Sequence, residues 1–440
     1  MNIERMLFSK STLDFLYLFF SNIFQKLLGL IRELVIAFFL GSSILYANFL
    51  LLRVVADLFS QLTAGNALKA NLLPKFTKAY NKENKISLVG LFRFAKSTSI
   101  YLFIGSQIIQ TGVIFYLNLE NSILFFSASL VLSFSISFNF INTVFLTILQ
   151  AKGQFLKFSF ASILNSSIFT ILVYPFISLF SILGLAVSRV LGILGMTFAY
   201  VIPLRKENNG EELTISSSDF NFPTLILGNF ANVILISSRF IAGVDGSNSI
   251  TYFMYAVVVL NTLLTSVVGN ISTLVLRKSA IQKDIKMIIY SLLIAIVVGV
   301  SMVFIFQFYG EDIINIIYVR GAFNVNDAIL TSEYLSKLSY SFVGLFVATT
   351  LFQPFLSTSI EKTKKIRINL MNIFLMSIFI PSLVVLFLPI STINSTIIVM
   401  SISSFVRCQI IVETRLSSNQ CATTDDKGSS LAVQLDKSSP

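Results

Sequence analysis

The chain has 440 residues, of which 55% are hydrophobic and 12% are charged, about half the charged share of an ordinary soluble domain. It contains no histidine and two cysteines, which excludes a zinc site of the usual His/Cys type and argues against a disulfide framework. The net charge of +11 does not indicate nucleic-acid binding, because no basic stretch is interleaved with stacking aromatic residues. The composition is typical of a protein solvated by lipid.

Hydropathy, interrupted at charges, prolines and Gly/Asn/Ser clusters, predicts an all-α polytopic membrane protein with about twelve transmembrane helices. In chain order the segments are 14–40, 44–68, 97–117, 121–149, 158–178, 181–203, 221–242, 249–276, 287–308, 330–357, 368–389 and 391–412. The first segment has no small-residue cleavage site, so we expect a retained helix rather than a signal peptide.

The distribution of basic residues predicts the orientation of these helices. If the N-terminus is cytoplasmic, most of the 32 Lys and Arg fall in inner segments, and Arg320 is the basic residue of the outer loops. This asymmetry follows the positive-inside rule. We therefore expect a multi-pass protein of the bacterial cytoplasmic (inner) membrane with both termini in the cytoplasm.

The polar stretch 204–220 divides the helices into two sets of six. We predict an N-lobe (1–203), a cytoplasmic linker (204–220), a C-lobe (221–413) and a disordered cytoplasmic tail (414–440). The lobes resemble each other weakly, since Gly41 and Gly243 each precede a long helix that ends near a Gly-Asn pair. Such pseudo-symmetry is common in transporters, where the substrate path lies in a central cavity between the repeats.

The first two segments carry charges that lipid would not tolerate. Lys26 and Glu33 are seven residues apart on one face of the first segment, while Arg32 is turned about 100° away and has no acid four residues to either side. In the second segment Arg53 and Asp57 form an i, i+4 pair, and Gln61 extends this pair into a polar stripe. These side chains must face protein, water or the interface.

Later segments add Arg189, Arg239 and the i, i+4 pair Glu333 and Lys337, for which a structural role is the simpler interpretation. A charge at a helix centre costs roughly 2.5 to 3.5 kcal/mol. Arg32 and Arg239 either bind a solute or reach toward the helix ends and neighbouring helices. Because the basic residues outnumber the acids, an internal cavity would favour an anionic solute, and Arg holds phosphate oxygens in a bidentate fork.

Two stretches resemble a known family. Residues 24–80 (FQKLLGLIRELVIAFFLG at their start) resemble the opening of the MurJ/MviN lipid flippases, and YVRGAFNVND (318–327) resembles that family's R-G-x-F segment, with Arg320, Gly321 and Phe323 as the matching residues. The resemblance implies a MOP-superfamily, MATE-like fold with two lobes around a cavity that opens alternately to each side. It also implies export of lipid-linked sugars, and it matches Arg32 and Glu33 to the family's first-helix pair.

Other family charges are missing. The aspartate expected at the start of the second helix falls on Ala47, beside Asn48. An expected arginine falls near Ser60 or Gln61, and the arginine expected in the eighth helix falls on Val258. We also expect twelve helices, whereas the peptidoglycan flippases usually carry two more. The candidate substrate-binding residues are therefore Arg32, Arg53, Arg239, Lys26 and Asn48, and the candidate cavity or coupling residues are Glu33, Asp57 and Gln61.

The leading hypothesis is a flippase for a polyprenyl-pyrophosphate-linked saccharide, a precursor of cell wall or surface polysaccharide. Three alternative functions remain open. The protein is a flippase for lipid II itself, a cation-coupled multidrug exporter of the same superfamily, or a degenerate paralogue that transports nothing. A membrane enzyme is disfavoured by the absence of histidine, of sizeable loops and of acid clusters. We expect no cofactor. We expect coupling to the membrane potential or an ion gradient, because no GxxxxGK[ST] loop is present. Lipids and cell-envelope enzymes are the expected partners.

Overall fold

The computed structural model describes residues 10–64, 72–73, 75–77, 88–119, 121–206, 229–243, 247–263, 285–356, 364–387 and 391–404. Apart from one isolated bridge between Arg320 and Phe323, the regular structure of these residues is helical. The helices are α2 (Lys10–Leu40), α3 (Ile44–Ala64), α5 (Leu88–Tyr116), α6 (Ser122–Ala151), α7 (Phe155–Met196), η1 (Thr197–Val201), α8 (Ile202–Lys206), α10 (Phe230–Gly243), α11 (Ser249–Leu263), α13 (Ile285–Tyr318), α14 (Val325–Leu356) and α15 (Lys364–Phe387), followed by a helix at 392–404.

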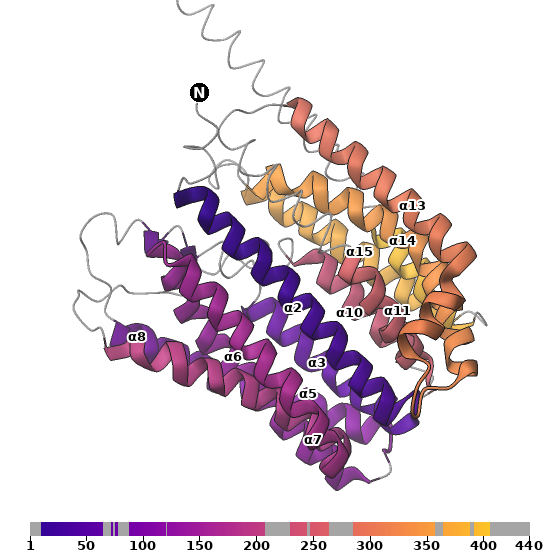
Figure 1. The fold of residues 1–440 in the computed structure, drawn as a ribbon, viewed down its shortest axis with the longest axis horizontal. Coiled ribbons are helices and arrows are strands. Elements are labelled where there is room, and N and C mark those ends of the chain that lie inside the picture. The colour runs from indigo at the N-terminus through magenta and orange to yellow at the C-terminus, as the bar shows by residue number, and fades with distance from the viewer. Residues whose placement is uncertain are drawn as a thin grey trace, which may run out of the picture.

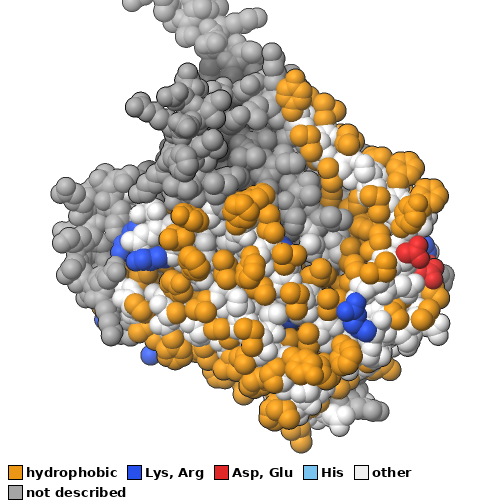
Figure 2. Space-filling model, viewed as in Figure 1, with side chains coloured by type: hydrophobic (Ala, Val, Ile, Leu, Met, Phe, Trp, Pro, Cys, Tyr) orange, Lys and Arg blue, Asp and Glu red, His pale blue; other side chains and the backbone are white. Residues whose placement is uncertain are grey.

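On the face shown in Figure 2 the described residues are largely hydrophobic, with few charged side chains in view. Within the described part of the chain, five helices are long and apolar enough to cross a membrane. Large apolar side chains such as Phe115, Phe308 and Phe387 are 71%, 74% and 84% exposed. Side chains of this kind are stable on a surface that lipid covers, so the predicted all-α membrane fold is confirmed.

Helix α7 is a hairpin of two spans. Ser181 (φ 51°, ψ −130°) interrupts its helical geometry, and after this turn the chain runs back along itself, so that Gly192 lies against Asn165. A Cβ atom on Gly184 would overlap the backbone carbonyl of Phe176. The missing side chain lets the two halves approach closely, and both predicted spans, 158–178 and 181–203, are present.

Several predicted spans are longer in the structure, α5 and α13 the most. Helix α5 begins at Leu88 rather than 97 because Leu88, Leu91 and Ala95 bury one face, while Arg93 and Lys96 point outward, as in an amphipathic helix. Helix α13 continues past 308 to Tyr318. Parts of the predicted segments lie outside the described residues, namely 65–68, 221–228, 264–276, 357, 388–389 and 405–412, as do the linker after 206 and the tail.

The helices form two sets (Figure 1). Helices α2 to α8, indigo to magenta in Figure 1, pack among themselves, and α10 to α15, salmon to yellow, pack on the other side. Helix α3 contacts α10 and α11, and α2 contacts α11 and α13. We call this boundary the seam, and α2 and α3 supply its N-terminal side.

Three serines of the run 127–137 pack α6 against α5, namely Ser129, Ser133 and Ser137. Gln107 donates to the Ser129 hydroxyl at 3.0 Å, and the Ser137 hydroxyl donates to the Ser99 carbonyl at 2.9 Å. Small polar residues at this spacing allow close helix approach and satisfy one another in lipid. This stripe therefore joins helices rather than lining a water-filled path.

Candidate functional site

The polar stripe of α3 faces the seam. Arg53 Nε lies 3.6 Å from Asp57 Oδ2, which confirms the i, i+4 pair. One turn further, Gln61 accepts a hydrogen bond from Asn232 at 3.0 Å through its side chain, and from Asn229 at 2.7 Å through its carbonyl oxygen. The stripe thus joins α3 to residues that begin the C-terminal set.

Arginines from three helices meet at Asp57. Arg189 Nη2, from the second half of α7, donates to Asp57 Oδ1 at 2.9 Å, and Arg239 Nη1, from α10, donates to Oδ2 at 3.3 Å. Arg53 approaches the same Oδ2 from the preceding turn of α3. Because α10 belongs to the C-terminal set, the Asp57 carboxylate forms an ion pair across the seam.

A second carboxylate lies beside the first. Glu33 Oε1 is 3.9 Å from both Arg32 Nη2 and Arg53 Nη1, and its side chain is only 4% exposed. The Arg32 guanidinium also lies over the Phe169 ring, 4.3 Å from its centroid. The sequence offers Arg32 no acid four residues away, but in the structure its long side chain lies 3.9 Å from the adjacent Glu33, which is an ion pair beyond hydrogen-bond distance.

We call Arg32, Glu33, Arg53, Asp57, Arg189 and Arg239 the arginine cluster. Its arginine side chains are 14% to 20% exposed, and its four guanidinium groups exceed its two carboxylates in charge. Within the described part of the chain, Nε of Arg32 and of Arg239 and Nη1 of Arg189 are buried without a hydrogen-bond partner. Unused donors of this kind are costly, so the cluster has both the charge and the donors to hold an anion.

Two other candidate binding residues lie near the cluster along the chain. Lys26 is half-buried on α2, and Asn48 is half-buried on α3. Lys26 precedes Arg32 by less than two helical turns, and Asn48 precedes Arg53 by about one and a half. Both lie on the two helices that supply the N-terminal side of the seam, and their role stays a prediction.

The motif Arg320, Gly321, Phe323 lies at the end of the bundle where α2 meets α3. Arg320 is exposed and donates to the carbonyl of Ile316, outside the arginine cluster. Gly321 has φ +62°, and a Cβ atom there would overlap Phe38. Ala322 N–H donates to the Phe38 carbonyl at 2.8 Å. The motif is a docking turn that holds the α13–α14 connection against α2.

The sequence prediction did not assign Arg189 to the site. Its charge inside an apolar segment was a signal, but its partner Asp57 is 132 positions away, beyond any helical period. By contrast, Lys337 and Glu333 form the predicted pair at 2.6 Å, with side chains 40% and 42% exposed. This ion pair lies apart from the arginine cluster and has an ordinary structural role.

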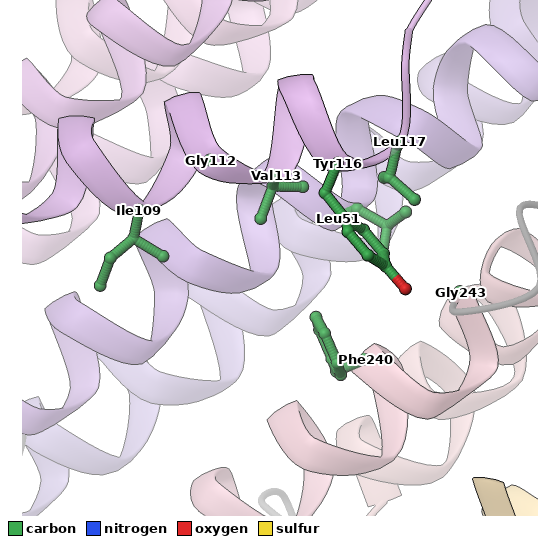
Figure 3. A pocket seen from close by; sticks show the side chains of 8 residues that line it. All are labelled: Leu51, Ile109, Gly112, Val113, Tyr116, Leu117, Phe240 and Gly243. Atoms are coloured by element: carbon green, nitrogen blue, oxygen red, sulfur yellow. The ribbon is translucent and has the colours of Figure 1, made fainter.

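An apolar cavity of about 260 Å³ lies beside the seam between α5 and α10 (Figure 3). Its lining includes Leu51 of α3, Val113 of α5 and Phe240 of α10. It offers no charged group, so it cannot replace the arginine cluster as a site for a charged solute. Phe240 follows Arg239 directly, and its side chain turns toward this cavity while Arg239 turns to Asp57.

The fold and the cluster define a multi-pass helical membrane transporter with a charged site between two sets of helices. Residues 36–422 match the family model described as Lipid II flippase MurJ. The chain belongs to this MurJ family of lipid-linked precursor flippases, and it is a transporter rather than an enzyme. The match includes Arg53, Asp57, Arg189 and Arg239 but begins after Arg32 and Glu33.

Solved structures show the same fold. A lipid II flippase MurJ in an inward closed conformation is 18% identical, with a TM-score of 0.75 over 90% of this chain and 87% of that one. A MATE in complex with MaL6 is 13% identical, with a TM-score of 0.66 over 93% and 97%. An inward-facing multidrug resistance MATE family transporter of the MOP superfamily is 13% identical, with a TM-score of 0.62 over 93% and 96%. Among curated protein sequences no match was found.

Proposed function

We propose that the protein flips a polyprenyl-pyrophosphate-linked saccharide across the bacterial cytoplasmic membrane by alternating access, with both termini in the cytoplasm. The observation that supports this proposal is the arginine cluster. Guanidinium groups bind phosphate oxygens in bidentate fashion, and this cluster has surplus positive charge and unused donors at the seam between the two sets of helices.

Contacts across the seam close it at the end that carries Arg320, and these are the contacts that alternating access would have to break. Tyr255 Oη donates to the Gly41 carbonyl at 2.9 Å, and its ring packs against Tyr318 and Phe323 with centroids 4.9 and 5.2 Å away. Ser42 and Tyr252 both donate to the buried Asp327 carboxylate. Transport requires these contacts to open, and only a ligand or ion that binds the two states differently can drive that change.

The cluster argues against a cation-coupled multidrug exporter. Such a carrier needs a cavity carboxylate that is free to exchange a proton for a cationic drug. Here Glu33 lies between two arginines and Asp57 contacts three. A cationic ligand would face a net positive surface, so the energetics favour an anion.

The test is transport by the Arg32→Ala variant in cells that lack the wild-type protein. We expect loss of glycan export and of lipid-linked saccharide appearing at the outer surface, because a charge-assisted contact worth about 1.5–3 kcal/mol is removed. Membrane abundance and the elution profile in detergent report folding separately. Lys337→Ala removes a basic residue from a transmembrane helix outside the arginine cluster and is the matched control, expected to transport normally.

Normal export by Arg32→Ala would refute its binding role. If the wild-type protein itself flips no lipid-linked saccharide in purified vesicles, the proposed function is wrong. The interpretation of the protein as a paralogue without transport activity would then replace it. Lipid II and other polyprenyl-pyrophosphate saccharides share the charged group, so vesicles loaded with each in turn distinguish the two.

A further inference from the structure

Asp57 occupies the position at which an anionic ligand would satisfy the cluster. Its two oxygens accept from Arg189 and Arg239 at 2.9 and 3.3 Å, and Arg53 stands 3.6 Å away. The side chain is 16% exposed, so little water competes for these donors. Three guanidinium groups from three helices thus converge on one carboxylate, although each can serve a larger anion.

We propose that Asp57 is an internal counterion that the substrate's phosphates displace from Arg189 and Arg239, and that Arg189 is a further binding residue. The inference rests on the proposed function for the identity of the anion. Two phosphate groups offer more acceptor oxygens than one carboxylate. They can also use Nη1 of Arg189 and Nε of Arg239, the buried donors that Asp57 leaves without a partner.

The charges balance in the loaded state. The cluster has two more guanidinium groups than carboxylates, and a pyrophosphate that links a lipid to a sugar carries one negative charge on each phosphate. The occupied site is therefore neutral while Asp57 stays within it. Because a buried net charge is expensive in hydrocarbon surroundings, a neutral complex is the one most easily enclosed.

Displacement also acts on the seam. The Arg239–Asp57 contact joins α10 to α3, so a phosphate that takes Arg239 from Asp57 removes an attraction between the two sets of helices. Binding then favours a different arrangement of the sets through differential contacts, as a population shift requires. In the empty site Asp57 links α3 to α10 through Arg239, and the phosphates of the substrate break this link.

Asp57→Asn tests the inference by the sign of its effect. Affinity for inorganic pyrophosphate is measured by calorimetry on the purified full chain in detergent. A competitor that is removed raises this affinity, and we expect a rise of roughly 5- to 50-fold. If Asp57 instead only holds the arginines in position, the affinity falls, and that outcome overturns the proposal, as does an unchanged affinity. Glu333→Gln makes the same chemical change outside the cluster and should leave the affinity at the wild-type value.

The role of Arg189 is separated from that of Asp57 by a double variant. Arg189→Gln should lower pyrophosphate affinity by roughly tenfold or more, and it should do so again in the Asp57→Asn background. If Arg189 acts only through Asp57, the second loss vanishes and Arg189 is not a binding residue. If Asp57→Asn does not fold, the single Arg189→Gln variant still tests Arg189, because an unchanged pyrophosphate affinity would show that Arg189 does not bind the anion. These experiments measure equilibrium binding of pyrophosphate, whereas the proposed function is tested by flipping of a lipid-linked saccharide. Failure of the inference can therefore be distinguished from failure of the proposed function.

Discussion

At the scale of single residues, the Arg32 guanidinium is oriented by a ring as well as by an acid. It lies 4.3 Å from the Phe169 centroid and 3.9 Å from Glu33. A contact of this kind contributes about 0.5–2 kcal/mol. We therefore predict that Phe169→Leu weakens pyrophosphate binding roughly 2- to 30-fold, measured by calorimetry. Phe180→Leu, an exposed position of α7, is the control. Equal affinities for both variants and the wild type would contradict the ring's role.

Local spacing explains which of the cluster's contacts could be predicted from the sequence. The pairs Arg53–Asp57 and Glu333–Lys337 follow from the helical period. Arg189 and Arg239 reach Asp57 from 132 and 182 positions away. No periodic pattern relates residues on different helices, so the sequence identified these charges as costly in lipid but could not pair them.

At the scale of elements, the hairpin of α7 depends on Gly184. A methyl group there would overlap the Phe176 carbonyl, which is backbone and cannot turn away. We predict that Gly184→Ala separates the two halves, costing at least the 1–3 kcal/mol typical of overpacking, and lowers both the folded yield and the melting temperature in detergent. Gly112→Ala, with open space around its added methyl group, should fold like the wild type. An unaltered melting temperature for Gly184→Ala would show that the halves can part without cost.

Apolar length predicted the existence of the helices better than their ends. The amphipathic start of α5 was missed because a hydropathy window ends at Arg93 and Lys96, although buried residues continue to Leu88. The extension of α13 was missed for the same reason, since Glu311 and Asp312 are exposed on the helix beyond the apolar run. A charge interrupts a hydrophobic count but not a helix whose opposite face is buried.

At the scale of the whole molecule, the orientation of the protein in the membrane decides whether the closed end of the seam faces the cytoplasm or the outside. The contacts of Tyr255 and Asp327 close the end that carries Arg320. If the positive-inside assignment holds, that end faces outward and the described state is closed to the outside. The contacts across the seam at this end would then have to break before a transported saccharide leaves on the outer side.

Cysteine labelling in intact cells tests this orientation. With Cys408 and Cys421 replaced by serine, a cysteine at exposed Val325, next to the Arg320 turn, should react with a membrane-impermeant maleimide added outside. A cysteine at exposed Lys157, at the start of α7, should react only after permeabilisation. The two positions lie at opposite ends of the bundle. The first half of α7 runs from Lys157 toward the turn at Ser181, and Tyr174 near that turn packs against Phe39 of α2, next to Phe38, which binds the Arg320 turn. The reverse pattern of labelling would place the closed end in the cytoplasm and would contradict the predicted orientation.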